Sequence, residues 1–233
     1  MFIRILAALS CCISLLAQAQ PLSLRIAIDA NNPPFMYADS SGRPAGIYAE
    51  QLLALAQRSG IAISIEPMPW KRALAYLQRG SHGVAGLYSN PERQKHYLYS
   101  KPLYQEVLTV YGRKLDRHPR YNQICDFDGK RVGVLAGWFY SDAFSQARDQ
   151  GRLRADEASR DAQNVEKLRL GRIDYLIGIR ESIEPQMGEQ LEALGVFAVN
   201  PTYIALPRTA ANLHLLQRLN QALPPLPQPA NAP

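Results

Sequence analysis

The feature that most constrains the fold is an alternation of strand and helix patterns that occurs twice along the chain. In the first block, apolar residues at positions 24, 26 and 28 alternate with polar or small ones, which predicts a strand ending at Asp29. Residues 47–60 have helical spacing, positions 61, 63 and 65 alternate again, and a second helix is predicted up to Gly80. Short loops between such units are typical of an α/β protein with a largely parallel sheet.

The second block follows an extended stretch near residues 102–111. Buried strands are predicted for RVGVLAG, residues 131–137, and for IDYLIGI, residues 173–179, with helical segments between them. A second extended stretch covers residues 195–206, and a helix is predicted over residues 211–223. We therefore expect two lobes, with residues 20–108 and 200–223 in lobe 1 and residues 109–199 in lobe 2.

Both ends of the chain have their own patterns. Arg4, an apolar stretch over residues 5–16 and the small-residue pattern Ala17-Gln18-Ala19 predict a signal peptide, residues 1–19, cleaved after Ala19. The expected destination is the periplasm. A lipid anchor at Cys11 or Cys12 is the alternative, but the apolar run before these residues is short for it. At the other end, the proline-rich residues 224–233 predict a flexible tail.

Charge and composition exclude several classes of function. The chain has 26 Lys and Arg against 20 Asp and Glu, a net charge of +6, and its basic residues are scattered among acids. This distribution indicates a solvated surface and no nucleic-acid partner. The four histidines have no spacing typical of metal ligands, and no glycine-rich phosphate loop is present, so we expect neither a metal nor a cofactor. After signal cleavage Cys125 is the only cysteine, which excludes an internal disulfide.

The segment SNPERQKHY, residues 89–97, predicts a helix that begins with an arginine in its first turn. Asn90 is a good N-cap and Pro91 a good first helical residue. The helix dipole disfavours a cation at the position of Arg93, whereas a bound anion would meet both the guanidinium and free backbone N–H groups. Arg93 therefore either pairs with Glu92 or another acid, or binds an anionic ligand.

Several polar segments come directly after predicted strands. They are Asp29 with its following loop, residues 88–93 and residues 137–140. In open α/β sheets, ligands bind at the carboxyl ends of the parallel strands. We expect these segments to line a cleft between the lobes.

In sequence order, the pieces IDANNPPFMY, GRPAGIYAEQLLALAQRSG, PMPWKRALAYLQRG, SNPERQKHYLYSKPLY, DGKRVGVLAGWF and GRIDYLIG cover nearly the whole chain after the signal peptide. This ordered set resembles the extracellular solute-binding proteins of the polar amino-acid family, receptors that deliver ligands to ABC importers. The resemblance implies a two-lobed, periplasmic-binding-protein-like (type II) fold with two hinge strands. It also implies a monomer that binds a small molecule and meets a membrane permease or sensor.

The resemblance also implies roles for single residues. Arg93 would hold the carboxylate of the ligand, Asp29 would lie near the pocket rim, Asn32 and Phe35 would touch the ligand, and Trp70 would cover it. Each has a structural alternative. Arg93 could form a surface salt bridge, Asp29 could cap its loop, and Trp70 could fill the space between helix and sheet.

The chain departs from the family pattern at the acid that usually holds the ammonium of an amino acid and at three positions where small hydroxyl residues are expected. Ile179 replaces the usual acid, and Tyr88, Trp138 and Phe139 replace small hydroxyl residues. An unpaired ammonium in such a pocket costs much desolvation free energy, which favours an anion or an aromatic acid over a zwitterion. Aromatic faces can still hold a cation, and Trp138 and Phe139 are equally compatible with core packing.

Two other functions remain open at this point. A few enzymes share this fold, notably cyclohexadienyl dehydratases, and Arg93 with Asp29 or Glu181 would superficially fit their chemistry. General acid–base catalysis also needs a carboxyl group with a tuned pKa at the reacting atom, which a sequence does not show. We therefore expect a binding protein and no enzyme. A sensory or orphan receptor with the same cleft is the second alternative.

Overall fold

The computed structural model describes residues 22–226 of the chain. The predicted signal peptide with its cleavage after Ala19, the alternative lipid anchor at Cys11 or Cys12, and most of the predicted tail lie outside the described residues. Within residues 22–226, no helix has the length and hydropathy needed to cross a bilayer.

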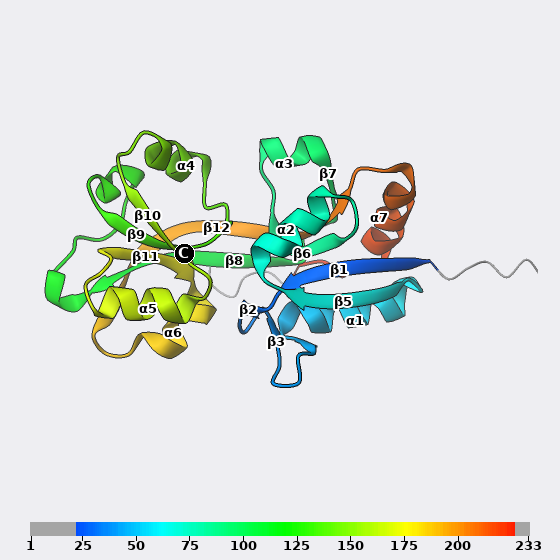
Figure 1. Cartoon of the computed structure of the whole chain (residues 1–233), viewed down its shortest axis with the longest axis horizontal. Helices are drawn as coiled ribbons and strands as arrows, with labels where there is room; N and C mark the ends of the chain where they lie inside the picture. Colours follow the sequence, from blue (N-terminus) through cyan, green and yellow to red (C-terminus); the bar gives the residue numbers. More distant parts are fainter. Residues whose placement is uncertain (1–21, 227–233) are drawn as a thin grey trace, which may run out of the picture.

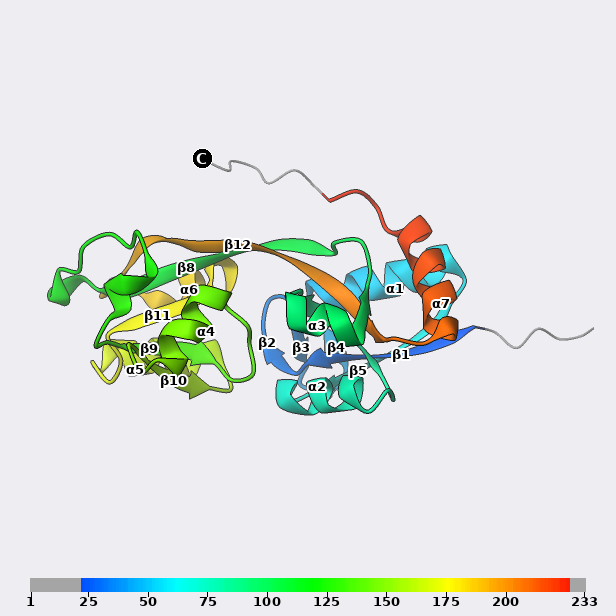
Figure 2. The same ribbon diagram turned by 90° about the horizontal axis from the view of Figure 1, so that it is seen from above.

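One long sheet runs through the whole protein, in the strand order β10-β9-β11-β8-β12-β6-β1-β5, with β7 paired to β12. Its two central strands, β8 (Tyr104–Arg113) and β12 (Leu191–Pro207), are antiparallel to each other. They span the distance between two groups of helices and strands, so the protein has two lobes (Figures 1 and 2).

Lobe 1 is built on the parallel strands that the sequence predicts. Strand β1 lies between β5 and β6 and is parallel to both. The elements of lobe 1 are β1 (Ser23–Asp29), β5 (Ala62–Met68), β6 (Gly83–Tyr88), β7 (Tyr97–Tyr99), α1 (Ile47–Ser59), α2 (Trp70–Gln78), α3 (Pro91–His96), α7 (Ala210–Ala222) and a small sheet of β2 (Asn31–Asn32), β3 (Met36–Ala38) and β4 (Pro44–Ala45).

Lobe 2 repeats the plan on a smaller scale, with β9 flanked by the parallel strands β10 and β11. Its elements are β9 (Arg131–Leu135), β10 (Arg154–Ala158), β11 (Tyr175–Ile179), α4 (Asp142–Asp149), α5 (Asp161–Arg169), α6 (Arg180–Met187) and the short 3₁₀ helices η1 (Lys114–Asp116) and η2 (Ile124–Phe127). The α/β fold with two lobes is thus confirmed. The predicted lobe boundaries at 108/109 and 199/200 fall inside β8 and β12 and stay predictions.

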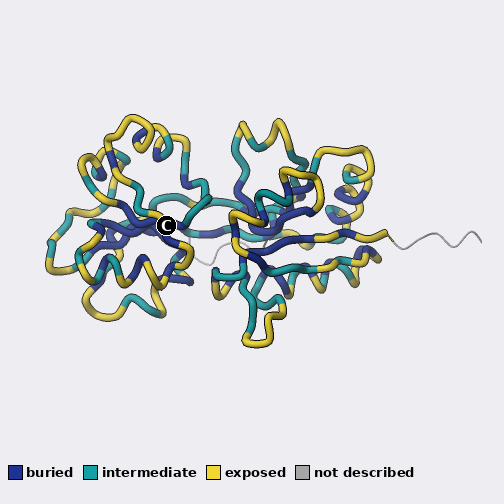
Figure 3. Tube along the Cα trace, viewed as in Figure 1, coloured by how far each residue is buried: buried dark blue, intermediate teal, exposed yellow. Residues whose placement is uncertain are grey.

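The buried side chains follow the predicted periodicity. In β1, Leu24 and Ile26 are buried, whereas Arg25 between them is exposed, as the two-residue period of a strand requires. Figure 3 shows exposed residues on the outer helices, whereas β8 is mostly buried and much of β12 is half-buried. Helix α7 packs on lobe 1 through Leu215, Leu216 and Leu219. Their spacing of three and four residues places them on one face of the helix.

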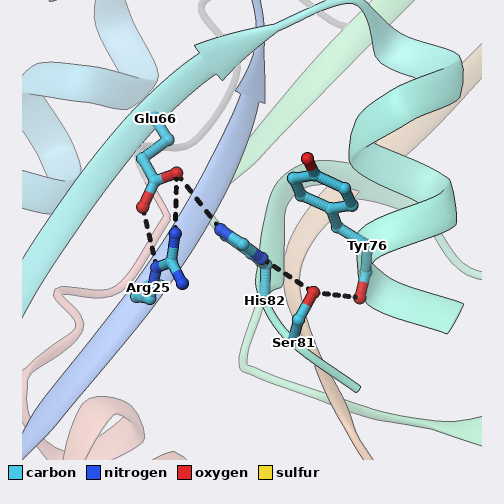
Figure 4. A network of polar contacts seen from close by, with 5 residues as sticks. All are labelled: Arg25, Glu66, Tyr76, Ser81 and His82. Atoms are coloured by element: carbon cyan, nitrogen blue, oxygen red, sulfur yellow. Dashed lines mark hydrogen bonds and ion pairs between the residues drawn. The ribbon is translucent and has the colours of Figure 1, made fainter. Parts of the chain in front are cut away.

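A polar network joins β1, β5 and the start of β6 in lobe 1 (Figure 4). The Arg25 guanidinium donates two hydrogen bonds to Glu66, 2.9 and 3.2 Å long, and lowers the pKa of this carboxyl group. His82 Nε2 lies 3.2 Å from Glu66 Oε2, and His82 Nδ1 lies 2.9 Å from Ser81 Oγ. The Tyr76 ring stacks on the imidazole. Because these residues belong to three different segments, the network ties the strands together away from their carboxyl ends.

Candidate functional site

A cavity of about 270 Å³ lies between the two lobes. Lobe 1 contributes the end of β1, the following loop and the start of α2, and lobe 2 contributes the end of β9 and the loops after β9 and β10. The carboxyl ends of parallel strands from both lobes therefore meet at one space, as predicted for ligand sites in such folds. The residues that line it are Asp29, Asn31, Pro69, Trp70, Lys71, Leu135, Ala136, Trp138 and Ser159.

Two tryptophans from opposite lobes form the aromatic wall of this cavity. The ring centroids of Trp70 and Trp138 are 6.1 Å apart, and Trp138 also meets Tyr88 edge to face at 5.6 Å. Gly137 precedes Trp138 with φ of +81°, a conformation that glycine adopts without strain. A Cβ atom at Gly137 would lie 3.5 Å from Trp70 Cδ1, so the backbone of lobe 2 comes close to the indole. The sequence prediction had left packing and ligand contact open for both tryptophans, and both line the cavity.

Asp29 ends β1 at the floor of the cavity. Its Oδ1 accepts a hydrogen bond of 3.0 Å from Asn31 N, which is the loop-capping contact considered from sequence. The side chain is only 4 % exposed, and burial raises its pKa to about 6. Asp29 therefore caps its loop and lines the cavity at once.

Arg93 lies at the start of α3, as the sequence predicts. Asn90 Oδ1 accepts a hydrogen bond of 2.7 Å from Arg93 N, which is the expected N-cap. The guanidinium donates to Tyr88 O at 3.0 Å, and burial lowers its pKa. Within residues 22–226, no carboxylate lies within 4.0 Å of it, and Glu92 pairs instead with Lys95. Arg93 is not one of the residues that line the 270 Å³ cavity.

A second, smaller cavity of about 70 Å³ lies beside the hinge strands. It is lined by Tyr88, Ser89, Phe139, Asn200, Pro201 and Tyr203. The structure thus places Tyr88 and Phe139, both predicted to touch a ligand, at a space separate from the one that holds Asp29 and Trp70.

The other two predicted site residues, Asn32 and Phe35, are buried in lobe 1. Phe35 is fully buried and packs against the rings of Tyr48 and Tyr104, with centroids 5.7 and 5.4 Å away. Asn32 Oδ1 lies 3.4 Å from Ser182 Oγ of lobe 2. Neither lines the larger cavity.

Two further polar contacts join the lobes. Lys71 Nζ lies 3.1 Å from Glu157 Oε2, and Ser182 Oγ donates to Pro33 O at 2.9 Å. This ion pair is exposed, so it contributes little to the free energy of folding. It nevertheless engages the ammonium group of Lys71, which is the positive charge on the cavity wall.

Glu106 is a buried acid at the hinge that the sequence reasoning missed. It belongs to β8, is fully buried, and accepts hydrogen bonds from the hydroxyl groups of Tyr48 and Tyr88. Tyr48 also lies 3.0 Å from Thr202 Oγ1 of β12. Burial raises the pKa of Glu106 to about 7, although both tyrosine contacts lower it. A glutamate inside the apolar run LYQEVLTVY was the signal that could have identified it.

Within the described residues, no group of three or more His, Cys, Asp or Glu side chains is arranged to hold a metal ion. The larger cavity thus has Trp70 and Trp138 in its walls and the buried carboxyl group of Asp29 in its lining, and the half-buried Arg93 lies at the neighbouring strand end, outside this lining.

Known binding proteins resemble this chain in sequence and in fold. The L-cystine-binding protein TcyJ of Escherichia coli strain K12 is 25% identical over 207 residues, which cover 86% of this chain and 76% of TcyJ. An ancestral arginine-binding protein bound to arginine superposes with a TM-score of 0.73 at 23% identity, covering 86% of this chain and 90% of that one.

Two further solved structures share the fold. A histidine kinase sensor domain with similarity to periplasmic binding proteins gives a TM-score of 0.75 at 18% identity, covering 86% of this chain and 88% of that one. An ancestral amino acid-binding protein, described as a precursor of cyclohexadienyl dehydratase, gives 0.70 at 22% identity over 86% of this chain and 88% of that one. The sequence profile of one family, the bacterial extracellular solute-binding proteins of family 3, matches residues 24–227, and the chain belongs to that family.

Proposed function

We propose that this protein is a periplasmic receptor that binds a small carboxylate-bearing solute, an amino acid or a related organic acid, and delivers it to an ABC importer. The observation that carries the proposal is the cavity of about 270 Å³ whose walls come from both lobes. Its volume is near the lower end of the range for small-molecule sites, which suits a ligand of amino-acid size. Similarity to proteins named for the binding of cystine and arginine supports the same class of ligand.

In this proposal Arg93 holds the carboxylate of the ligand. Its guanidinium donates a hydrogen bond to Tyr88 O at the carboxyl end of β6. Strand β6 is parallel to its neighbour β1, which ends at Asp29. The two residues therefore belong to the same edge of the sheet. A planar guanidinium without a carboxylate partner is well suited to bind one bidentately. The ligand would extend from the tryptophan-lined cavity toward Arg93.

A sensory receptor is the second candidate, favoured by the likeness to a kinase sensor domain, a likeness of fold alone. Both functions use the same cleft and differ in the membrane partner. Co-purification with a permease from detergent-solubilised membranes supports import. Co-purification with a sensor kinase supports signalling.

We propose binding rather than catalysis because the carboxyl group of Glu106 is enclosed by the protein. Glu106 has the raised pKa of a general acid, but it is fully buried and both of its oxygens accept tyrosine hydroxyls. A general acid must reach the reacting group. Turnover of prephenate or arogenate by the purified protein would instead support the dehydratase alternative.

The proposed function is tested by a thermal-shift screen over amino acids, aromatic acids, dicarboxylates and polyamines. A ligand at about 100 times its dissociation constant stabilises the folded state by about 2.7 kcal/mol, which is readily measured. Arg93→Ala should abolish the shift given by carboxylates. Arg148→Ala is the matched control, because Arg148 pairs with Asp149 on the surface of α4. A carboxylate that stabilises wild type and Arg93→Ala equally would remove Arg93 from the site.

A further inference from the structure

Glu106 of β8 is a buried acid at the hinge, and both of its carboxyl oxygens accept tyrosine hydroxyl groups. Tyr48 of α1 donates to Oε1, and Tyr88 at the end of β6 donates to Oε2. The Glu106 side chain is fully buried, and the Tyr48 hydroxyl also lies 3.0 Å from Thr202 Oγ1 of β12. The carboxyl group therefore connects two elements of lobe 1 with both hinge strands.

The contact between Glu106 and Tyr88 crosses one of the hinge strands. Strand β12 lies between β6 and β8, and its Thr202 is paired with Tyr88 on one side and with Tyr104 on the other. Glu106 is two residues beyond Tyr104 in β8, so their side chains lie on the same face of the sheet. On this face the carboxyl group reaches past β12 to the Tyr88 hydroxyl. The direction of the Tyr88 side chain is therefore set from β8.

Tyr88 contacts two other parts of the candidate site. Its backbone carbonyl accepts the hydrogen bond of 3.0 Å from the Arg93 guanidinium. Its ring meets Trp138 of lobe 2 edge to face, with centroids 5.6 Å apart, and Trp138 lines the larger cavity. Tyr88 itself lines the smaller cavity. A residue that fixes Tyr88 thus acts on the aromatic wall and on the strand end that holds the guanidinium.

The carboxyl group of Glu106 does more than packing requires. A buried acid costs desolvation free energy, and a well-packed apolar side chain in its place is often as stable or more stable. An apolar side chain cannot fix the direction of two hydroxyl groups, because apolar contact is non-directional whereas a hydrogen bond is directional. A polar network whose members are all bonded also holds one arrangement of its side chains. These properties indicate a role in orientation.

We propose that Glu106 is a positioning residue for ligand binding: it holds the Tyr88 hydroxyl, so that the Tyr88 ring stays against Trp138 and the ligand meets an aromatic wall that is already arranged. The proposal rests on the proposed function and adds a residue that does not itself touch the ligand. Because its hydroxyl is bonded to Glu106, Tyr88 offers a ligand its ring and no hydroxyl group.

Tyr48 provides a matched control for Tyr88. Both hydroxyl groups bond to Glu106, so Tyr48→Phe and Tyr88→Phe each remove one donor from the same carboxyl group. The Tyr48 ring packs on Tyr104, whereas the Tyr88 ring packs on Trp138. If Glu106 only stabilised the fold, both variants should behave alike. If it positions Tyr88, only Tyr88→Phe should disturb the aromatic wall.

The first experiment needs no ligand. In a Trp70→Phe background Trp138 is the only tryptophan, and its quenching by acrylamide measures how well the Tyr88 ring shields the indole. We expect a larger quenching constant and a red-shifted emission maximum in Tyr88→Phe and Glu106→Leu, and no change in Tyr48→Phe. Glu106→Gln should lie between wild type and Glu106→Leu, because the amide keeps one acceptor oxygen. Unchanged quenching in folded Tyr88→Phe, or equal changes in both tyrosine variants, would overturn the proposal.

The second experiment measures affinity by isothermal titration calorimetry, with L-arginine, L-cystine and succinate as probes. Without the hydrogen bond, the Tyr88 side chain can leave its single rotamer for as many as three, so a probe should bind Tyr88→Phe about 3-fold or more weakly. Glu106→Leu should lose as much, and the double variant no more than Glu106→Leu alone, because both substitutions remove one contact. Tyr48→Phe should bind like wild type.

The outcomes separate this role from the receptor function. If a probe binds wild type and both tyrosine variants equally, or if both tyrosine variants lose the same affinity, Glu106 does not position Tyr88 and the receptor function stands. If no compound of the full thermal-shift screen binds, the receptor function fails, and the quenching of Trp138 alone decides whether Glu106 holds Tyr88. Should Glu106→Leu fail to fold, the two tyrosine variants give the same decision.

Discussion

Trp70 of lobe 1 and Trp138 of lobe 2 meet across the cleft, with ring centroids 6.1 Å apart and ring planes at 46°. The chain has only two tryptophans, and both line the larger cavity. Indole emission therefore reports on this one place, because no other tryptophan contributes.

A ligand that enters the cavity should change the emission maximum or intensity of the protein. The change should persist with a smaller amplitude in Trp138→Phe, in which Trp70 alone remains. It is measured by titrating the protein with a ligand found in the screen and recording emission excited at the indole band. Saturable binding by calorimetry without any change in emission would contradict a site between the tryptophans.

Glu106 should make the protein less stable as pH rises. Its pKa is about 7 in the folded state and near its ordinary value of 4.5 when unfolded, so the folded state binds more protons between these values. The free energy of unfolding therefore falls from about pH 4.5 to about pH 7 and is constant above, as far as this group is concerned.

Glu106→Gln should flatten this part of the pH profile, because the amide does not titrate. Urea unfolding at about pH 5 and pH 8 measures the difference in slope between variant and wild type. Glu189→Gln is the control, an exposed glutamate outside any element. An identical decline in wild type and Glu106→Gln would show that Glu106 is ionised throughout.

Two glycines with positive φ differ in what surrounds them, which gives a matched pair of alanine variants. Gly46 has φ of +99°, and a Cβ atom there would lie 2.6 Å from Pro34 O and 2.7 Å from Phe35 O. Gly42 has φ of +77° and no atom within 4 Å. Gly42→Ala should cost about 1–2 kcal/mol from backbone strain alone. Gly46→Ala should cost roughly 2–5 kcal/mol, because the backbone before α1 must move as well.

Denaturant unfolding of both glycine variants measures these costs. An equal loss of unfolding free energy in the two variants would mean that the contact with residues 34 and 35 does not constrain Gly46.

The N-cap of α3 should affect both stability and ligand binding. Asn90→Ala removes the acceptor for Arg93 N and should cost about 1 kcal/mol. Asn90→Asp keeps an acceptor and should cost less. If Arg93 binds the ligand carboxylate, Asn90→Ala should also weaken binding, since the first turn of α3 places that guanidinium. Calorimetry with an identified ligand and urea unfolding separate the two effects.

The elements that the sequence predicted are those with a strong local pattern. The helix predicted over residues 211–223 is found at Ala210–Ala222, and the N-cap at Asn90 is present. Strand β10, with the sequence RADEA, was missed because its residues are mostly polar and do not alternate. Helix α6 was missed because it contains Pro185 and has little apolar periodicity. Strand β10 and helix α6 form because they pack against neighbouring elements, and such packing leaves no signal in the local sequence.

The candidate site was only partly predictable for a related reason. Asp29, Trp70 and Trp138 follow strand ends, and strand ends converge in this class of fold, so their meeting at one cavity could be expected. The partners of Glu106 could not, because they depend on contacts between residues far apart in the chain.

The sequence by itself determined where strands and helices alternate and where the chain crosses between the two blocks, because periodicity and capping act over a few residues. Only the tertiary structure decided which side chains share a space. It directed Arg93 toward Tyr88 O and placed the hydroxyl groups of Tyr48 and Tyr88 on Glu106. The physical reason is that the hinge strands β8 and β12 set how the two lobes face each other, and no local pattern encodes the distance between side chains on opposite lobes.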